Sequence, residues 1–275
     1  MASPTETEVG TVISLWRYPV KSMMGEELKE TEITERGLLG DRAYALIDSS
    51  DGKAATAKNP RKWPRLFYFG ARSIEPVSRA TNSFPVRITL PDGTTTDSDQ
   101  SDLNQILSEA LNRDVTLCAA QHGSVDAEEY WPDMEGLDYR DTVTDFTLPK
   151  GTFFDCAMVH LVTSATLDRL HEHYPGGRFE VQRFRPNIVV ETGNEKGFSE
   201  NEWISHTLAI GDDVRLNITG PCGRCVMTTL AQGDLPRDSG ILRTAVQQNQ
   251  GHVGVYASVV KGGAIRHGDQ VRLIT

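Results

Sequence analysis

Short apolar segments, each ended by a turn signal, are the feature of this sequence that most restricts its fold. In the first half they cover residues 11–18, 42–48, 66–69 and 85–90, and Pro, Gly or Asp follows most of them. Segments of this kind are typical of strands. We therefore expect a β-rich fold with few, short helices.

The second half continues the same pattern. Predicted strands cover residues 157–162, 188–191, 207–210, 214–218, 226–230, 253–260 and 270–274. Residues 211–216 (GDDVRL) resemble residues 268–273 (GDQVRL), and each copy predicts a Gly-Asp turn leading into a strand. Two copies are too few for a solenoid, and repeated turn-and-strand units with few helices favour a β-barrel.

Two segments have helical periodicity. The first covers residues 102–111, with Ser101 as its N-cap and Asn112 at its end. The second begins near Thr163 or Ser164 and ends before a Pro-Gly-Gly run. Both are short, which agrees with a fold that strands dominate.

The composition changes near the middle of the chain. Residues 119–149 are rich in Asp and Glu and poor in aliphatic side chains. We expect an acidic connecting segment there, held to the surface by aromatic side chains. The predicted domains are therefore residues 1–118 and residues 150–275.

Charge and length exclude several classes of protein. The 275 residues include 28 Lys and Arg against 38 Asp and Glu, which gives a net charge of −10. A nonspecific nucleic-acid binder normally carries a basic patch, so we expect no nucleic-acid partner. No apolar run approaches the ~20 residues of a membrane-spanning helix, and the polar, acidic start does not resemble a leader peptide. We expect a cytoplasmic protein without membrane attachment.

The strongest local signal for chemistry is the Cys-x-x-Cys pair of Cys222 and Cys225, with Arg224 between them. A thioredoxin-type redox pair needs a helix that opens at the second Cys, but residues 226–230 predict a strand. A structural zinc site needs two further ligands, preferably a second close pair, which the other two cysteines do not form. Two hypotheses remain: two thiols in a core strand, or one thiolate that binds a soft transition metal, its ionised form favoured by Arg224.

A second cluster combines cationic and hydroxyl side chains with Pro and Gly turns. Lys21 and Ser22 follow a Tyr-Pro-Val run, and Arg42 ends a Gly-rich stretch. Arg and Lys donors suit a phosphate group. The alternative is a solvated loop with an Asp41–Arg42 pair at the surface.

A third cluster precedes the predicted strand at residues 188–191. Arg183, Arg185 and Asn187 place polar groups at the mouth of that strand. The segment is compatible with a ligand site or with a structural ion pair. His160, within an apolar run, is interpreted as a core histidine rather than a ligand.

These clusters, in this order, resemble one family. The matching stretches are residues 18–22, 37–42, 154–164, 183–187 and 224–229, and residues 268–271 end the pattern. The chain resembles MOSC-domain proteins, named after the C-terminal domain of molybdenum-cofactor sulfurase, and is similar to bacterial relatives of the mitochondrial amidoxime-reducing component. The resemblance covers almost the whole chain. It implies an N-terminal MOSC-associated β-barrel domain over residues 1–118 and a MOSC β-barrel over residues 150–275.

The resemblance also implies a cofactor. Members of the family bind the molybdenum cofactor, in which molybdopterin sulfurs hold Mo and one protein cysteine completes the ligand set. By motif position the metal ligand is Cys225, and Cys222 does not bind the metal. Lys21, Ser22 and Arg42 fall where the family grips the cofactor's phosphate. The other residues that the resemblance places at the cofactor are Asp155, Thr163, Ser164, Arg183, Arg185, Asn187 and Arg224.

The implied reaction is a two-electron oxo-transfer reduction of a small N-hydroxylated compound, or of a related N-oxide or S-oxide. Cys225 and Asp155 are the expected catalytic residues, with Asp155 either a proton donor or a structural carboxylate. The electrons are expected from a separate ferredoxin- or flavin-type reductase. The alternative is a carrier of sulfur or of the cofactor that uses Cys225 without turnover.

Overall fold

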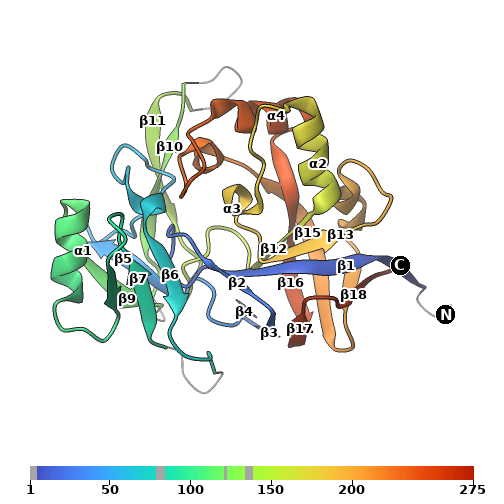
Figure 1. Cartoon of the computed structure of the whole chain (residues 1–275), viewed down its shortest axis with the longest axis horizontal. Coiled ribbons are helices and arrows are strands. Elements are labelled where there is room, and N and C mark those ends of the chain that lie inside the picture. Colours follow the sequence, from blue (N-terminus) through green and yellow to red (C-terminus); the bar gives the residue numbers. More distant parts are fainter. Residues whose placement is uncertain (1–4, 79–83, 121–122, 134–138) are drawn as a thin grey trace.

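Strands dominate the computed structural model, which describes residues 5–78, 84–120, 123–133 and 139–275 (Figure 1). Seven of them form a closed barrel, in which β1 pairs with β13 to complete the ring of strands. Around the barrel they are β13 (Ile188–Glu191), β12 (Val159–Thr163), β16 (His252–Lys261), β15 (Val214–Gly223), β14 (Thr207–Ile210), β18 (Gln270–Ile274) and β1 (Glu6–Arg17). The β-rich fold predicted from the sequence is confirmed.

Strand β1 comes from the N-terminal end of the chain but completes the barrel of the C-terminal half. It lies antiparallel between β13 and β18, with Leu15 opposite Ile188. Val12 and Leu15 have no exposed surface and belong to the barrel core. The domain boundaries predicted from the sequence stay a prediction, but the first strand of the chain packs with the second half.

The two copies of the turn-and-strand pattern lie on either side of one barrel strand. β15 and β18 both pair with β14, in antiparallel register. Gly211 and Gly268, at the starts of the two copies, have φ angles of 55° and 91°. Glycine adopts this left-handed region without steric cost, which explains why both turns begin with it.

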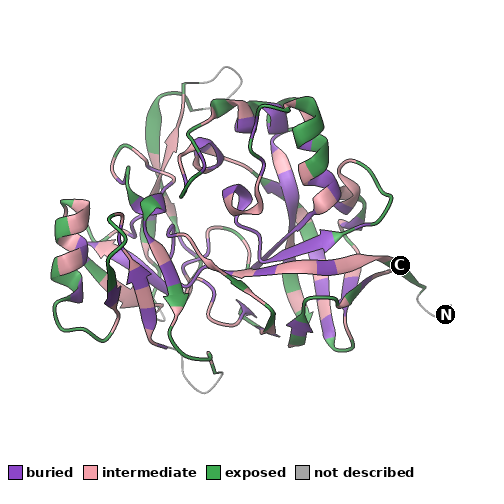
Figure 2. Ribbon diagram, in the orientation of Figure 1, coloured by how far each residue is buried: buried purple, intermediate pink, exposed green. Residues whose placement is uncertain are grey.

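The N-terminal half packs around a second core. Its other elements are β2 (Glu26–Leu28), β3 (Glu30–Thr34), β4 (Gly37–Leu38), β5 (Tyr44–Asp48), η1 (Leu66–Tyr68), β6 (Gly70–Ser73), β7 (Val86–Thr89), β8 (Thr95–Asp97), α1 (Leu103–Leu111) and β9 (Val115–Ala119). Trp63, Phe67 and Phe69 are buried in this core. Figure 2 shows α1 on the outside of this half with its outer face exposed. Asn112 ends α1 as predicted, in a left-handed conformation, but the N-cap is Asp102, without a side-chain capping hydrogen bond, and not the predicted Ser101.

The acidic segment contains a hairpin that its composition did not predict. β10 (Asp126–Trp131) and β11 (Thr142–Thr147) pair antiparallel along six residues each. Residues 121–122 and 134–138, which belong to the predicted acidic connection, lie outside the described residues.

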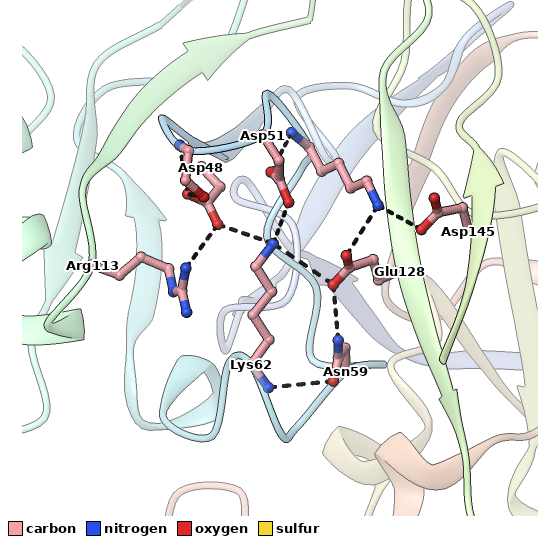
Figure 3. A network of polar contacts seen from close by, with 9 residues as sticks. Asp48, Asp51, Asn59, Lys62, Arg113, Glu128 and Asp145 are labelled. Carbon is pink, nitrogen blue, oxygen red and sulfur yellow. Dashed lines mark hydrogen bonds and ion pairs between the residues drawn. The ribbon is translucent and has the colours of Figure 1, made fainter. Parts of the chain in front are cut away.

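Ion pairs fasten this hairpin to the loop that follows β5 (Figure 3). Glu128 on β10 accepts hydrogen bonds from Lys53 Nζ at 3.0 Å and from Asn59 Nδ2 at 2.9 Å. Lys53 also bonds Asp145 on β11 at 2.7 Å, and Lys62 Nζ lies 3.7 Å from Glu128. The acidic side chains of the hairpin therefore meet lysines of the N-terminal half, and the loop at residues 53–62 is held against β10.

Two segments predicted as strands are short 3-10 helices. Residues 66–69 contain η1, and residues 226–230 contain η3 (Val226–Thr229). In η3 the Thr228 and Thr229 hydroxyls donate to the carbonyls of Cys225 and Val226, at 3.0 and 2.7 Å. These local bonds satisfy backbone groups that a strand would direct to a neighbour.

Helices and a further strand complete the second half. They are α2 (Ser164–His173), α3 (Val181–Phe184), η2 (Ser199–Trp203), α4 (Ser239–Asn249) and β17 (Gly263–Arg266). The start of α2 agrees with the sequence, since Thr163 is its N-cap and accepts a hydrogen bond from Thr166 N at 3.1 Å. Helix α4 was not predicted, although its buried Ile241, Leu242 and Ala245 follow helical spacing. No helix among the described residues is long and apolar enough to cross a membrane.

A buried carboxyl group links α2 to η2. Glu200 has no exposed surface, and its Oε2 accepts hydrogen bonds from the hydroxyls of Thr163 and Thr166 at 2.6 and 2.7 Å. Its Oε1 has no hydrogen-bond partner among the described residues. Burial raises the pKa of Glu200, although the two threonine hydroxyls oppose the shift.

Replacing this carboxyl group by an amide, Glu200→Gln, should stabilise the protein near pH 8 and have little effect near pH 4. A raised pKa means that the folded state retains a proton which the unfolded state releases above pH ~4.3, so the stability of the natural protein falls as the pH rises. The amide releases no proton. Urea unfolding midpoints at both pH values test this, and a variant that is less stable near pH 8 would show that the fold favours the carboxylate.

Candidate functional site

A cavity of about 330 Å³ collects polar residues from both halves of the chain. Eight predicted site residues line it: Lys21, Ser22, Arg42, Asp155, Arg185, Asn187, Arg224 and Cys225. Its lining contains five cationic side chains, with Lys58 the fifth, against the carboxylates of Glu129 and Asp155. This surplus of positive charge suits an anionic ligand. A second cavity, of about 360 Å³, shares Arg42 and Phe154 with the first but has no cysteine in its lining.

Three of the lining residues have a backbone conformation that is uncommon outside glycine. Ser22, Arg42 and Arg185 have φ angles of 62°, 46° and 53°. The left-handed region costs a residue with a Cβ roughly 1–2 kcal/mol. Arg185 is the C-cap residue of α3, where this conformation is common, whereas at Ser22 and Arg42 a glycine would remove the cost together with a side chain that lines the cavity.

Asp41 joins the loops that form one wall. Its carboxylate is fully buried and accepts hydrogen bonds from the backbone N of Tyr18 at 2.7 Å and from Asn187 Nδ2 at 3.0 Å. It also forms an ion pair with Arg42, whose side chain is 16% exposed. The pair therefore lies inside the protein, and the alternative of a solvated surface pair is wrong. Sequence reasoning had not placed Asp41 in the site.

Asp155 lies between two lysines. It forms an ion pair with Lys21, whose Nζ also donates to the carbonyl of Phe153 at 3.0 Å, and its Oδ2 is 3.6 Å from Lys58 Nζ. Burial acts to raise the pKa of Asp155, but the two lysines outweigh it and hold the pKa well below its usual range. Asp155 is therefore ionised at neutral pH, which favours the role of a structural carboxylate over that of a proton donor.

Lys58 is a lining residue without a signal in the sequence. Its ammonium group lies 3.6 Å from Glu129 and from Asp155, and 4.7 Å from the ring centroid of Phe146. The backbone of its segment is fixed on both sides, because Tyr130 N donates to the carbonyl of Lys58 at 2.8 Å and Ala57 N donates to Ser22 Oγ at 3.1 Å. The hairpin and the fold of the loop bring Lys58 to the cavity, and neither follows from a short motif.

The two cysteines of the Cys-x-x-Cys pair have different surroundings. Cys222 is 1% exposed, and its Sγ accepts a hydrogen bond from Arg224 Nη1 at 2.6 Å. Burial acts to raise the pKa of Cys222, but Arg224 and His160 outweigh it and lower the pKa to about 6. Burial raises the pKa of Cys225, with Lys58 opposing it. Arg224 therefore favours the thiolate of Cys222, which corrects the expectation that it ionises the predicted metal-binding cysteine.

His160 is buried, as expected of a core histidine, but it also lines the cavity. Its Nε2 lies 3.1 Å from the carbonyl oxygen of Val253, and its ring lies edge-on to Tyr256 at 6.0 Å between centroids. Tyr256, Glu129 and Trp131 also line the cavity and were not predicted. They lie on β10 and β16, and the pairing of these strands decides which of their side chains face the cavity.

Three predicted site residues do not line this cavity. The Thr163 hydroxyl is bonded to Glu200, and Ser164 is the first residue of α2. Arg183 has no exposed surface and donates hydrogen bonds to backbone carbonyls. These are the carbonyls of Arg178, Thr228, Leu230 and Pro236, at 2.6, 3.3, 3.2 and 2.8 Å. Arg183 thus holds η3 and the loop after it in place.

The donor set fits a phosphate-bearing metal cofactor. Arg224 Nε is a buried donor with no hydrogen-bond partner in the part of the chain that the structure describes. Within the same residues no group of three or more His, Cys, Asp and Glu side chains could hold a metal ion. A metal bound here would receive most of its ligands from the cofactor. The cavity lining contains three thiols: Cys225, Cys222, which is bonded to Arg224, and Cys156, which is exposed.

Known proteins match this chain over both halves. The model of the MOSC N-terminal beta barrel domain matches residues 9–131, and that of the MOSC domain matches residues 149–272. Mitochondrial amidoxime reducing component 2 of Rattus norvegicus is 28% identical over 96% of this chain and 83% of its own length. Mitochondrial amidoxime-reducing component 1 of Homo sapiens is 27% identical over 81% of this chain and 67% of its own.

Two further similarities are more limited. Molybdenum cofactor sulfurase of Oryza sativa subsp. japonica is 26% identical over 78% of this chain but only 28% of its own length. The crystal structure of the YUAD protein from Bacillus subtilis has a TM-score of 0.50 at 11% identity and covers 99% of both chains. This likeness supports the fold.

Cys222 should titrate as a thiolate near pH 6 in protein prepared without a cofactor, because Arg224 and His160 lower its pKa. Thiolate absorbance in the ultraviolet, followed from pH 5 to about pH 9, should rise early in the natural protein and in Cys225→Ser. In Cys222→Ser the early rise should be lost. If the early rise were lost in Cys225→Ser instead, Cys225 would be the thiol with the low pKa and the assignment to Cys222 would be wrong.

Proposed function

This chain belongs to the MOSC family, and we propose that it is a molybdenum-cofactor-dependent oxidoreductase that removes oxygen from small N-hydroxylated compounds or related N-oxides and S-oxides. The observation that carries the proposal is the shared cavity, to which the N-terminal half brings cations and the MOSC domain brings Cys225. Relatives named amidoxime reducing components support the substrate class. The relatives are named mitochondrial, and a cytoplasmic location stays our prediction for this chain.

The cationic wall would hold the cofactor's phosphate and pterin. We assign the phosphate to Lys21, Ser22 and Arg42, and the pterin to Arg185, Asn187 and Arg224. Charge-assisted hydrogen bonds contribute roughly 1.5–3 kcal/mol each, so a few such contacts suffice for tight binding. The left-handed backbone at Ser22 and Arg42 supports this assignment, because a glycine at either position would remove the strain but also the side chain.

Cys225 would provide the protein's ligand to the metal. A thiolate is a soft ligand that suits a transition metal of this kind. Its pKa is raised by burial, so binding to the metal would have to displace the thiol proton, and Lys58 nearby favours the anion. When bound, the cofactor would supply the two-electron redox chemistry for removing the substrate's oxygen.

The proposed reaction requires both protons and electrons. Reducing a hydroxylamine-type N–OH group to N–H releases water and consumes two electrons and two protons. Burial acts to lower the pKa of Lys58, but Asp155, Cys225 and Glu129 outweigh it and hold the pKa well above its usual range, so Lys58 would stay charged and stabilise an anion rather than give up its proton. The electrons would come from a separate ferredoxin- or flavin-type reductase.

A carrier function is the second candidate, and the match to a molybdenum cofactor sulfurase favours it. In that case Cys225 would hold sulfur or the cofactor without turning over a substrate. The two functions differ in what the purified protein contains. Molybdenum near one per chain with reductase activity supports the enzyme, whereas sulfane sulfur on a thiol without molybdenum supports the carrier.

Single substitutions of the two cysteines should show which sulfur binds the metal. Cys225→Ser should abolish turnover with a viologen as electron donor and should deplete or alter the molybdenum site, because a hydroxyl does not ionise near neutral pH and is a harder ligand. Cys222→Ser should retain molybdenum and most of the activity. The measurements are molybdenum per chain and the rate of reduction of an N-hydroxylated substrate, after purification from a host that makes the cofactor.

Cys222→Ser is also the matched control, because it removes a neighbouring thiol from the same cavity. Equal losses in both variants would contradict a single metal-binding thiolate and would indicate a redox pair or a zinc site instead.

A further inference from the structure

Tyr18 lies between two of the guanidinium groups that line the cavity. Its ring centroid is 4.7 Å from Arg42 Cζ and 4.1 Å from Arg185 Cζ. A cation within ~6 Å of an aromatic centroid is attracted by the ring's quadrupole, and more strongly where water is excluded. Tyr18 has no exposed surface, so both contacts lie inside the protein.

The backbone of Tyr18 is fixed to the same loop that carries one of these arginines. Its N donates to Asp41 Oδ1 at 2.7 Å, and its carbonyl accepts a hydrogen bond from Arg42 N at 2.8 Å. Contacts within the protein therefore fix the backbone from which the ring projects. Its hydroxyl has no hydrogen-bond partner among the described residues, so the ring rather than the hydroxyl makes the contacts that the structure shows.

The two guanidinium groups need compensation for their mutual repulsion. Burial lowers the pKa of Arg185 to about 10, and the charge of Arg42 adds to that effect. One carboxylate, Asp41, pairs with Arg42, while Arg185 Nη1 donates to the carbonyl of Met23 at 2.7 Å. The electron-rich ring of Tyr18 attracts both cations without neutralising either.

We propose that Tyr18 is a positioning residue for anion binding, whose ring holds Arg42 and Arg185 in the cavity wall so that their remaining N–H groups can meet a phosphate-bearing ligand. This inference deepens the proposed function and rests on its phosphate-binding wall. A ring that only fills space would behave differently, because packing depends on shape and not on the charge distribution of the ring.

Fluorination separates charge distribution from shape. In the full chain, prepared without cofactor, residue 18 is replaced first by Phe (Tyr18→Phe) and then by mono-, di- and pentafluorinated phenylalanines, which progressively remove the ring's negative face at nearly constant volume. Affinity for inorganic phosphate is measured by calorimetry, with thermal unfolding of each protein as a check on folding.

Tyr18→Phe should bind phosphate within about twofold of the natural protein, because it retains the ring, and its unfolding temperature should rise with loss of an unpartnered buried hydroxyl. The fluorinated series should bind progressively more weakly, by about tenfold at pentafluorophenylalanine, which corresponds to ~1.4 kcal/mol. Pentafluorination of Phe69, a buried ring of the N-terminal core, is the matched control and should leave phosphate affinity unchanged.

The outcomes distinguish this inference from the proposed function. A natural protein that binds phosphate, together with a fluorinated series of constant affinity, would overturn the positioning role alone. If Tyr18→Phe bound phosphate more weakly, the hydroxyl and not the ring would support phosphate binding, and this result would also overturn the positioning role of the ring. A natural protein that fails to bind phosphate would contradict the anion-binding wall itself and, with it, the proposed cofactor site.

Discussion

The insertion of β1 between β13 and β18 is the constraint on which the site depends. It takes the first strand of the chain into the barrel of the second half, and Trp16 N donates to the carbonyl of Asn187 at 2.8 Å where that strand nears its end. The loop with Lys21 and Ser22 follows β1, and both side chains line the same cavity as Asn187. A cavity with cations from one half and Cys225 from the other follows from the strand order.

Buried charge is arranged so that the protein can fold while the cavity still attracts an anion. Isolated buried charges are costly, and partners reduce that cost. Asp41 and Asp155 each serve as the partner of a cation, and Asp41 also holds Tyr18 and Asn187 through hydrogen bonds. The carboxylates in the lining remain fewer than the cations. The cavity thus keeps positive charge in a chain whose net charge is −10.

The sequence predicted those parts of the structure that local pattern determines. The strands β13, β14 and β18 have the predicted bounds, because each is a short apolar run between turn residues. Residues 226–229 do not form a strand, since threonine hydroxyls and Arg183 satisfy their carbonyls. The sequence motifs contain most of the residues that line the cavity. Lys58 lies in none of them, and it reaches the cavity because ion pairs hold the β10–β11 hairpin against its loop. The partner of Arg224 could not be read from spacing, because two cysteines flank it and only the fold determines which sulfur lies against it.

Anomalous diffraction at the molybdenum absorption edge, from crystals of protein purified from a host that makes the cofactor, tests the central claim most directly. The account predicts one molybdenum peak per chain, within bonding distance of Cys225 Sγ, in the cavity that Lys21, Arg42 and Arg185 line. A molybdenum peak outside this cavity, or crystals of active protein without any such peak, would contradict it.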